Sequence, residues 1–285
     1  MRYIEVKSIL GNNNNVNLYR GCTHGCIYCD SRSLCYQVGD FEDIAVKKDA
    51  IPIFEAEIKR KRKPGLITTG SMCDPYLPLE RELQLTRQML EIIRDHRFSV
   101  SLLTKSELIL RDIDLIEDIN QRARALVCMT ITTYDDELCR RIERNVTVTS
   151  KRFACLELFR KRNIPIGIWL GPILPFINDS MDNMVKIVER CVEIGVRYII
   201  VFDFGTTKRA GSQEHFYQSL DRYFPGIKEK YIRYYGNNYS CPTPNNKELW
   251  QEFKRLCEKY HILYDLGSVY QDLMKADAPE QLRLF

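Results

Sequence analysis

The strongest constraint on the fold is a regular alternation of apolar strands and amphipathic helices along the first two thirds of the chain. Segments with helical periodicity, such as residues 80–95, separate six segments that we predict to be strands. The predicted strands are mostly apolar or β-branched, and they cover residues 16–21, 66–70, 98–104, 125–133, 164–173 and 196–205. Strands of this kind joined by helices are typical of a parallel sheet covered by helices. We therefore predict an α/β fold with a mostly parallel sheet, a partial and open (β/α)6 barrel of the TIM type.

The alternation weakens after residue 205. Residues 206–285 contain a predicted helix at about 245–260, and no clear linker separates them from the preceding part of the chain. We predict that residues 1–205 form the partial barrel and that residues 206–285 form a helical cap on the same domain. In barrels of this type the chemistry gathers at the carboxyl ends of the strands.

Composition excludes several classes of protein. The 285 residues contain no apolar run of about 18, so no membrane-spanning helix is expected. The N-terminus lacks a basic and then apolar signal pattern, and we expect a soluble cytoplasmic protein. The net charge of +4 permits a polyanionic partner without requiring one. Eleven cysteines in a chain of this size do not indicate a secreted disulfide framework.

Three of the cysteines form a cluster in residues 19–32, "YRGCTHGCIYCDSR", with the spacing C-x3-C-x2-C. Thiolates select zinc, copper(I) or iron–sulfur clusters. Three thiolates can bind three irons of a [4Fe-4S] cluster and leave the fourth iron open to another ligand. A zinc site that adds His24 or Cys35 as the fourth ligand is the alternative. We otherwise expect His24 to face solvent.

The cysteine motif, with Tyr28 just before its last cysteine, resembles the cluster-binding signature of the radical S-adenosylmethionine (SAM) superfamily. Further segments follow in the order seen in the spore photoproduct lyase-like (DNA repair photolyase-like) branch of that superfamily. They are "GSMCDPYLPLE", "LLTKSELILRDIDL", "MTITTYDDEL" and "IPIGIWLGPILPFIND". Together with the cysteine motif they cover about residues 15–205.

The resemblance implies a lyase-like radical SAM enzyme whose cofactors are a [4Fe-4S] cluster and SAM. In such enzymes the reduced cluster cleaves SAM to methionine and a 5′-deoxyadenosyl radical, which abstracts hydrogen from a substrate. The positions that match the family's metal ligands are Cys22, Cys26 and Cys29. The matching cofactor contacts are Tyr28 against the adenine, Lys105 at the carboxylate and Thr130 at the ribose. A lysine ammonium suits a carboxylate as a point charge.

One stretch departs from the family pattern. Many members carry Gly-Gly-Glu after the second strand to bind the amino group of SAM, whereas residues 69–74 here are "TGSMCD". The candidates for that role are the backbone at Gly70 and the hydroxyl of Ser71. The lyase uses a cysteine in this stretch as a hydrogen donor, and that position aligns nearer Ser71 than Cys73. Cys73 is therefore either the donor or a thiol packed beneath the site.

The sequence does not fix the substrate. The basic run at 59–63 either contacts phosphates or forms a solvated helix end. Residues 228–239 interleave basic side chains with tyrosines, which either stack nucleic-acid bases or pack a cap. We expect an unidentified substrate, with damaged DNA as one candidate, and an external flavodoxin-like or ferredoxin-like reductant. The alternatives are a zinc-stabilised nucleic-acid-binding protein without catalysis and an iron–sulfur electron carrier.

Overall fold

The structure, a computed structural model, describes residues 1–275 of the chain. Its centre is a six-stranded sheet in which every neighbouring pair is parallel, in the order β2-β5-β6-β7-β8-β9. These strands are β2 (Asn15–Val16), β5 (Leu66–Thr69), β6 (Ser99–Thr104), β7 (Ala125–Ile131), β8 (Ile166–Leu170) and β9 (Tyr198–Ile200). Within the described residues β2 and β9 do not pair with each other, so the barrel is not closed. The predicted partial (β/α)6 fold is confirmed.

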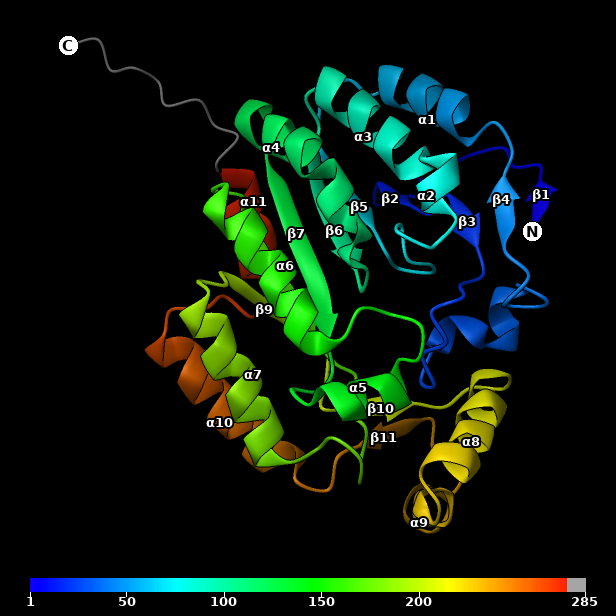
Figure 1. Cartoon of the computed structure of the whole chain (residues 1–285), viewed down its shortest axis with the longest axis vertical. Helices are drawn as coiled ribbons and strands as arrows, with labels where there is room; N and C mark the ends of the chain where they lie inside the picture. Colours follow the sequence, from blue (N-terminus) through cyan, green and yellow to red (C-terminus); the bar gives the residue numbers. More distant parts are fainter. Residues whose placement is uncertain (276–285) are drawn as a thin grey trace.

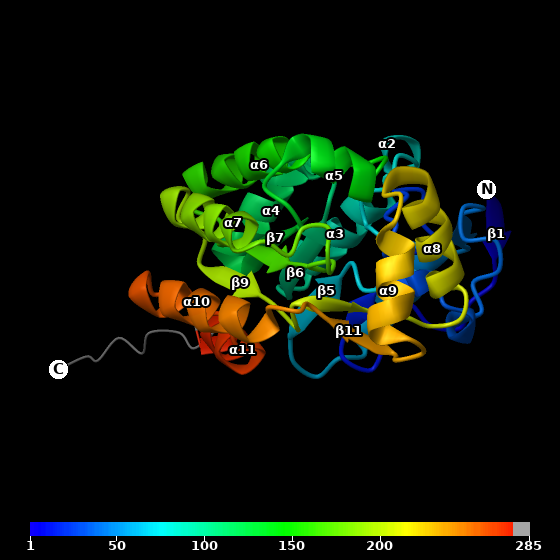
Figure 2. The same cartoon turned by 90° about the horizontal axis from the view of Figure 1, so that it is seen from below.

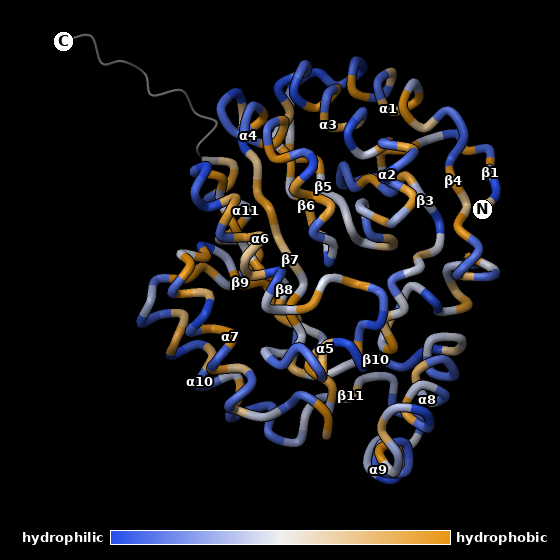
Figure 3. Tube along the Cα trace, viewed as in Figure 1, coloured by the Kyte–Doolittle hydropathy of each residue, from blue (hydrophilic) through white to orange (hydrophobic). Residues whose placement is uncertain are grey.

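Helices cover the outer face of the sheet (Figure 1). They are α1 (Ala50–Lys59), α3 (Leu85–Asp95), α4 (Ile113–Arg122), α6 (Thr149–Lys161) and α7 (Met181–Glu193). All seven residues of β7 are buried, as expected for a strand that is covered on both faces. Figure 3 shows β7 as a largely hydrophobic stretch in the middle of the molecule. The apolar strands therefore form the core, and their carboxyl ends point toward α5 (Asp136–Ile142).

The predicted helix at 80–95 is two helices in the structure. The first, α2 (Glu80–Leu83), ends at Gln84, whose φ of 49° lies in the left-handed region, and α3 starts at the next residue. The buried carboxylate of Glu80 accepts a hydrogen bond of 3.0 Å from the backbone N–H of Thr86 in the first turn of α3. This carboxylate satisfies an open donor at the start of α3, which a continuous helix would not have needed.

The predicted first strand at 16–21 is also divided. Only β2 belongs to the large sheet, while β3 (Tyr19–Arg20) joins a separate three-stranded sheet. That sheet has the order β1-β4-β3, with β1 (Arg2–Ile4) and β4 (Ala45–Lys47). Its strands are two or three residues long, which is too short to leave a periodic pattern in the sequence.

Up to residue 275, the chain after β9 forms a short antiparallel strand pair and four helices. The pair consists of β10 (Gly205–Thr207) and β11 (Ser240–Pro242). The helices are α8 (Ser212–Tyr223), α9 (Ile227–Tyr235), α10 (Asn246–Lys259) and α11 (Leu266–Lys275). The predicted helix at 245–260 is α10, which packs beside α7 (Figure 1). The division at residue 205 remains a prediction, and residues 276–285 of the predicted cap lie outside the described residues.

None of the helices within residues 1–275 combines the length and apolar character that crossing a bilayer requires.

Gly70 allows the end of β5 to approach β6 closely. Its φ is +84°, and a Cβ at this position would lie 2.6 Å from the carbonyl oxygen of Leu103. We expect Gly70→Ala to destabilise the protein by about 2 kcal/mol or more, because the clash adds to the backbone strain. Gly226→Ala is the matched control, since Gly226 has a φ of +81° but nothing within 4 Å of the added carbon. Urea unfolding of both variants measures the difference, and equal losses of stability would contradict this account.

Candidate active site at the carboxyl ends of the strands

A cavity of about 390 Å³ opens at the carboxyl ends of β5 to β9. A loop that we call the cysteine loop, residues 22–29, lines one part of it, and residues of the β10–β11 strand pair line another. Every residue that the sequence singled out as a site residue lines this cavity. These residues are Cys22, Cys26, Tyr28, Cys29, Gly70, Ser71, Cys73, Lys105 and Thr130. The fold thus brings the whole predicted set together at one site.

The cysteine loop is held by the segment that ends α5. The backbone of residues 23–27 pairs with that of residues 142–145 through an antiparallel bridge between Cys26 and Glu143. Two further backbone hydrogen bonds of 3.0 Å join the same segments. The side-chain amide of Asn145 also donates to a loop carbonyl at 2.9 Å. The loop is therefore fixed by backbone contacts that do not involve its thiols.

A buried ion pair lies behind this contact. The guanidinium of Arg152 lies 2.6 Å from the carboxylate of Glu143, and both side chains are fully buried. Arg152 also donates to the carbonyl oxygens of Thr130, at 2.7 Å, and Thr147, at 2.5 Å. The hydroxyl of Tyr28 donates to Glu143. The pair consequently links the cysteine loop to the end of β7.

The charges of this network follow from its contacts. Burial works to raise the pKa of Glu143, but Arg152 outweighs it, so the pKa is lowered and the carboxylate is ionised. Burial and the neighbouring negative charges raise the pKa of Tyr28 well above its ordinary value. Tyr28 is therefore a neutral phenol that donates to Glu143.

A second buried ion pair joins the cysteine loop to β5 and β6. The expectation that His24 faces solvent was wrong: it is 3% exposed, and its Nδ1 lies 3.3 Å from Oδ2 of Asp74. Asp74 also accepts hydrogen bonds from the hydroxyl of Thr104, at 2.6 Å, and from the backbone N–H of Lys105, at 2.8 Å. Burial alone would lower the pKa of His24, but Asp74 raises it to about 10. The imidazole is therefore a buried cation within the loop.

The three loop thiols differ in their surroundings. Burial raises the pKa of Cys26 and of Cys29. Burial acts in the same direction on Cys22, but the hydrogen bond and charge of His24 outweigh it and lower the pKa. No disulfide joins any of the cysteines. All three thiols are consequently available as ligands.

Lys105 presents a cation at the end of β6. Desolvation opposes its charge, but the nearby Cys26, Glu143 and Asp74 outweigh that effect and raise its pKa. Within residues 1–275 the ammonium group forms no hydrogen bond or salt bridge, in contrast to the two paired cations, His24 and Arg152. It is thus a charged group at the cavity that has no direct partner in the described chain.

The stretch after β5 supplies polar groups and a thiol. The hydroxyl of Ser71 donates to Oδ1 of Asn15 at 2.6 Å and accepts from the amide of Asn17 at 3.2 Å. The buried Cys73 thiol lies 3.3 Å from the carbonyl oxygen of Tyr19. Burial raises its pKa to about 12, so it remains protonated at neutral pH. Both side chains line the cavity, but only the thiol is buried.

The sequence analysis did not identify some of the residues at the site. Trp169 and Phe202 form an edge-to-face pair at the cavity, with ring centroids 5.2 Å apart, and Phe202 is 69% exposed. Both lie in or just after apolar strands, where aromatic residues are usually core. The sequence analysis did not identify Glu143 or Arg152 either, because Glu143 directly follows α5 and Arg152 lies inside α6. Asp74 lay within a noted segment but had no assigned role.

Within residues 1–275 no group of three or more His, Cys, Asp or Glu side chains is arranged to hold a single metal ion. In a [4Fe-4S] cluster each cysteine binds a different iron, so the thiols need not converge on one point. A structural zinc site, by contrast, requires four ligands around one ion.

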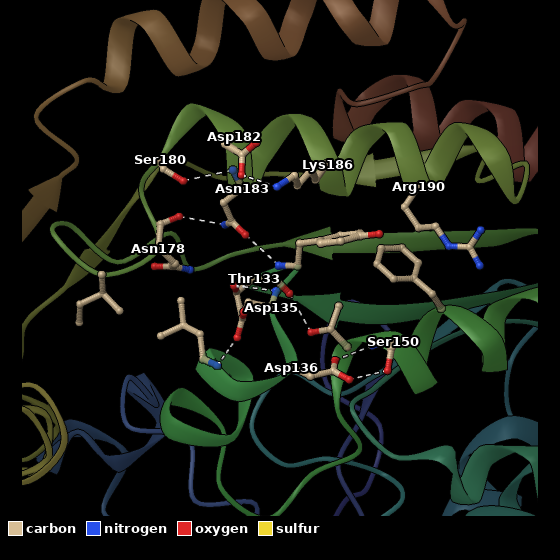
Figure 4. Close-up of a pocket in the computed structure, with 15 residues that line it drawn as sticks. Thr133, Asp135, Asp136, Ser150, Asn178, Ser180, Asp182, Asn183, Lys186 and Arg190 are labelled. Carbon is tan, nitrogen blue, oxygen red and sulfur yellow. Dashed lines mark hydrogen bonds and ion pairs between the residues drawn. The ribbon is translucent and has the colours of Figure 1, made fainter.

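A second cavity, of about 560 Å³, lies between α6, α7 and the loops that follow β7 and β8 (Figure 4). None of the predicted site residues lines it. The two asparagines in its wall are already bonded within the protein: Asn178 donates to the carbonyl of Thr132, and Asn183 accepts from the backbone N–H of Tyr134. The larger cavity is therefore separate from the candidate active site.

We expect Arg152→Met to destabilise the protein by about 3–5 kcal/mol, because it leaves the carboxylate of Glu143 buried without a counter-ion. The double variant Arg152→Met/Glu143→Gln removes both charges and should recover most of that loss. Chemical unfolding of the wild type and both variants measures the difference. A double variant no more stable than the single variant would show that the balance of charge between Arg152 and Glu143 does not stabilise residues 142–145.

Comparison with known proteins supports one family. The sequence profile of the radical SAM superfamily matches residues 16–189. An uncharacterized protein of Mycobacterium tuberculosis (strain H37Rv) is 26% identical over 277 residues, which cover 95% of this chain and 81% of that protein. An uncharacterized protein of Methanocaldococcus jannaschii is 34% identical over 166 residues, which cover 58% of this chain and 61% of that protein.

The fold is similar to that of spore photoproduct lyase complexed with dinucleoside spore photoproduct. The TM-score is 0.62 with 15% sequence identity, and the match covers 85% of this chain and 72% of the lyase. At this identity the match establishes the fold alone. The zinc-stabilised binding protein receives no support from these comparisons. Because the superfamily profile covers more than half of the chain, the protein is a member of the radical SAM superfamily, an enzyme whose cofactors are a [4Fe-4S] cluster and SAM and which needs an external reductant.

Proposed function

We propose that Cys22, Cys26 and Cys29 hold the [4Fe-4S] cluster and that the enzyme abstracts hydrogen from a nucleic-acid substrate, of which damaged DNA is the leading candidate. The observation that carries this proposal is that one cavity is lined by the cysteine loop, the strand ends and an aromatic pair whose Phe202 is exposed.

The donor set suits the cluster. Three free thiols come from one loop that backbone contacts hold in place, and thiolate is the ligand that iron–sulfur clusters use. Iron binding displaces the thiol protons, which the raised pKa values of Cys26 and Cys29 otherwise retain. The cationic His24 beside Cys22 offsets part of the negative charge that the thiolates bring into a buried site.

The other side chains suit SAM. Lys105 has a free ammonium for the carboxylate, and Thr130 lies at the end of β7 within reach of a ribose hydroxyl in the same cavity. Tyr28 presents its ring to the cavity while its hydroxyl is held by Glu143, which fixes the ring for contact with the adenine. The backbone at Gly70 and the hydroxyl of Ser71 are available to the amino group.

When bound, the reduced cluster and SAM supply the 5′-deoxyadenosyl radical that removes a hydrogen atom from the substrate. The chain's part is to orient the two cofactors and to exclude water from them. Cys73 remains our candidate for returning hydrogen to the product, since a donor thiol must be protonated and its raised pKa keeps it so. Its thiol donates a hydrogen bond to the carbonyl of Tyr19, which holds the side chain in the cavity wall.

The aromatic pair supports a planar substrate. Trp169 and Phe202 line the cavity, and an exposed ring beside a reactive site is suited to stacking on a nucleobase. Of the tyrosines in residues 228–239, Tyr231 and Tyr235 are buried and pack the cap, whereas Tyr239 is 48% exposed beside the cavity residue Ser240. The dinucleoside lesion bound by spore photoproduct lyase, which shares the fold, is a substrate of this chemical class.

We expect Cys26→Ala to lower the formation of 5′-deoxyadenosine by about 100-fold or more, since loss of a direct ligand costs at least as much as loss of its supporting contacts. The assay is anaerobic reconstitution with iron and sulfide, reduction with dithionite, addition of SAM and chromatography of the products. Cys35→Ala is the matched control, because Cys35 is exposed and lies outside the motif. Tight zinc binding without iron uptake, or equal losses in both variants, would contradict the proposal.

We expect Phe202→Ala to weaken binding of a thymine-rich, ultraviolet-irradiated oligonucleotide by about tenfold, because base–aromatic stacking contributes 1–3 kcal/mol per base. Cleavage of SAM without substrate should be unchanged. Fluorescence anisotropy of the labelled oligonucleotide measures binding to the reconstituted enzyme, with Tyr3→Ala as a control at an exposed aromatic residue on β1. Wild-type protein that binds no nucleic acid would refute this choice of substrate.

A further inference from the structure

Three exposed arginines lie together on the surface next to the cysteine loop. Arg141 belongs to α5, Arg144 follows it, and Arg222 lies near the end of α8. The guanidinium groups of Arg144 and Arg222 lie 5.4 Å and 5.2 Å from the centre of the Tyr223 ring. That of Arg141 lies 4.2 Å from the centre of the Phe224 ring. We call these three residues the arginine patch.

The charges of the arginine patch are not neutralised by the protein. Within residues 1–275 none of the three arginines forms a salt bridge with a carboxylate. The nearby acidic residues Glu137 and Asp221 are paired with other cations, Arg140 and Lys228. Stacking on aromatic rings leaves the edges of a guanidinium, where its N–H donors lie, free to bind carboxylates. Arg141 uses one of these donors on the carbonyl oxygen of Tyr223, so the free edges are mainly those of Arg144 and Arg222. The patch is therefore an ordered set of cations without counter-ions.

The arginine patch lies directly against the cysteine loop. The Cβ of Arg144 is 3.5 Å from the position that a Cβ on Gly25 would occupy. Arg144 lies within residues 142–145, the segment whose backbone pairs with the loop, and Arg141 directly precedes that segment. A protein bound to the patch would thus lie close to the loop cysteines.

We propose that the arginine patch is the docking surface for an acidic one-electron carrier protein of the flavodoxin or ferredoxin class. This inference rests on the proposed binding of the cluster by the cysteine loop. In the step concerned, the carrier is oxidised by one electron and the cluster is reduced by one electron, and no bond forms or breaks. Carboxylates on the carrier would pair with the free guanidinium edges, which steers its approach and sets its orientation.

The position of the arginine patch favours an electron carrier over the nucleic-acid substrate. The substrate has to reach the cavity, whose aromatic residues Trp169 and Phe202 lie in and after β8 and β9. Figure 2 shows α5 above the strands and β11, another part of the cavity wall, below them. Electrons do not need the cavity opening, and the arginine patch lies against the loop on the side covered by residues 142–145.

The test compares two reductants for the Arg144→Glu/Arg222→Glu double variant, reconstituted with its cluster. With dithionite, a small molecule that needs no docking, the variant should form 5′-deoxyadenosine within about twofold of the wild type. With an acidic flavodoxin kept reduced by NADPH and its reductase, we expect a loss of about tenfold or more at low salt. The wild-type rate with flavodoxin should fall as salt is added, while the rate with dithionite should not.

The control is Arg62→Glu/Lys63→Glu, which makes the same change in net charge at exposed positions beyond the end of α1. It should leave both rates unchanged. Equal rates for the patch variant and the wild type with flavodoxin would overturn the proposal, as would an equal loss in the control. A patch variant that loses oligonucleotide binding but keeps its flavodoxin rate would assign the surface to nucleic acid instead. No product with dithionite in the wild type would refute the proposed function itself.

Discussion

The position of the cysteine loop depends on the buried ion pair between Arg152 and Glu143. Neither charge is stable alone in the protein interior, so each requires the other as its counter-ion. The other hydrogen-bonding groups of the two side chains bond to the surrounding structure. The pair joins the end of β7, the hydroxyl of Tyr28 and the segment that carries the loop's backbone partner. A charge balance between two residues outside the cysteine loop thereby sets where the loop thiols lie.

The site as a whole separates three tasks by position. The cysteine loop and the paired His24 and Asp74 line the part of the cavity that we propose for the cluster, and the free cation of Lys105 lines the same cavity. The aromatic pair lines another part of the cavity, which we propose for a planar substrate. The arginine patch lies outside, behind the loop. In this proposal the cofactors and the substrate occupy different parts of one cavity and electrons enter from a separate surface, so each role can be tested without disturbing the others.

The pattern of apolar strands made it possible to predict both the parallel sheet and the convergence of the site residues. A strand buried on both faces must be apolar along its length, and parallel strands bring their carboxyl ends to one edge. The burial of His24 and the pairing of Glu143 with Arg152 had no such signal, because they depend on contacts between segments that no periodic pattern connects. The division of the helix at Gln84 depends likewise on a single buried carboxylate, that of Glu80.

The central claim is that three thiolates leave one iron of the cluster open for SAM. The most direct test is the hyperfine spectrum of the reduced, reconstituted enzyme with SAM isotopically labelled at its carboxylate oxygen or amino nitrogen. The account predicts a changed EPR signal and a coupling between the label and the cluster, as expected for direct binding to iron. A reduced cluster whose EPR signal is unchanged by SAM, with no coupling to either label, would contradict it.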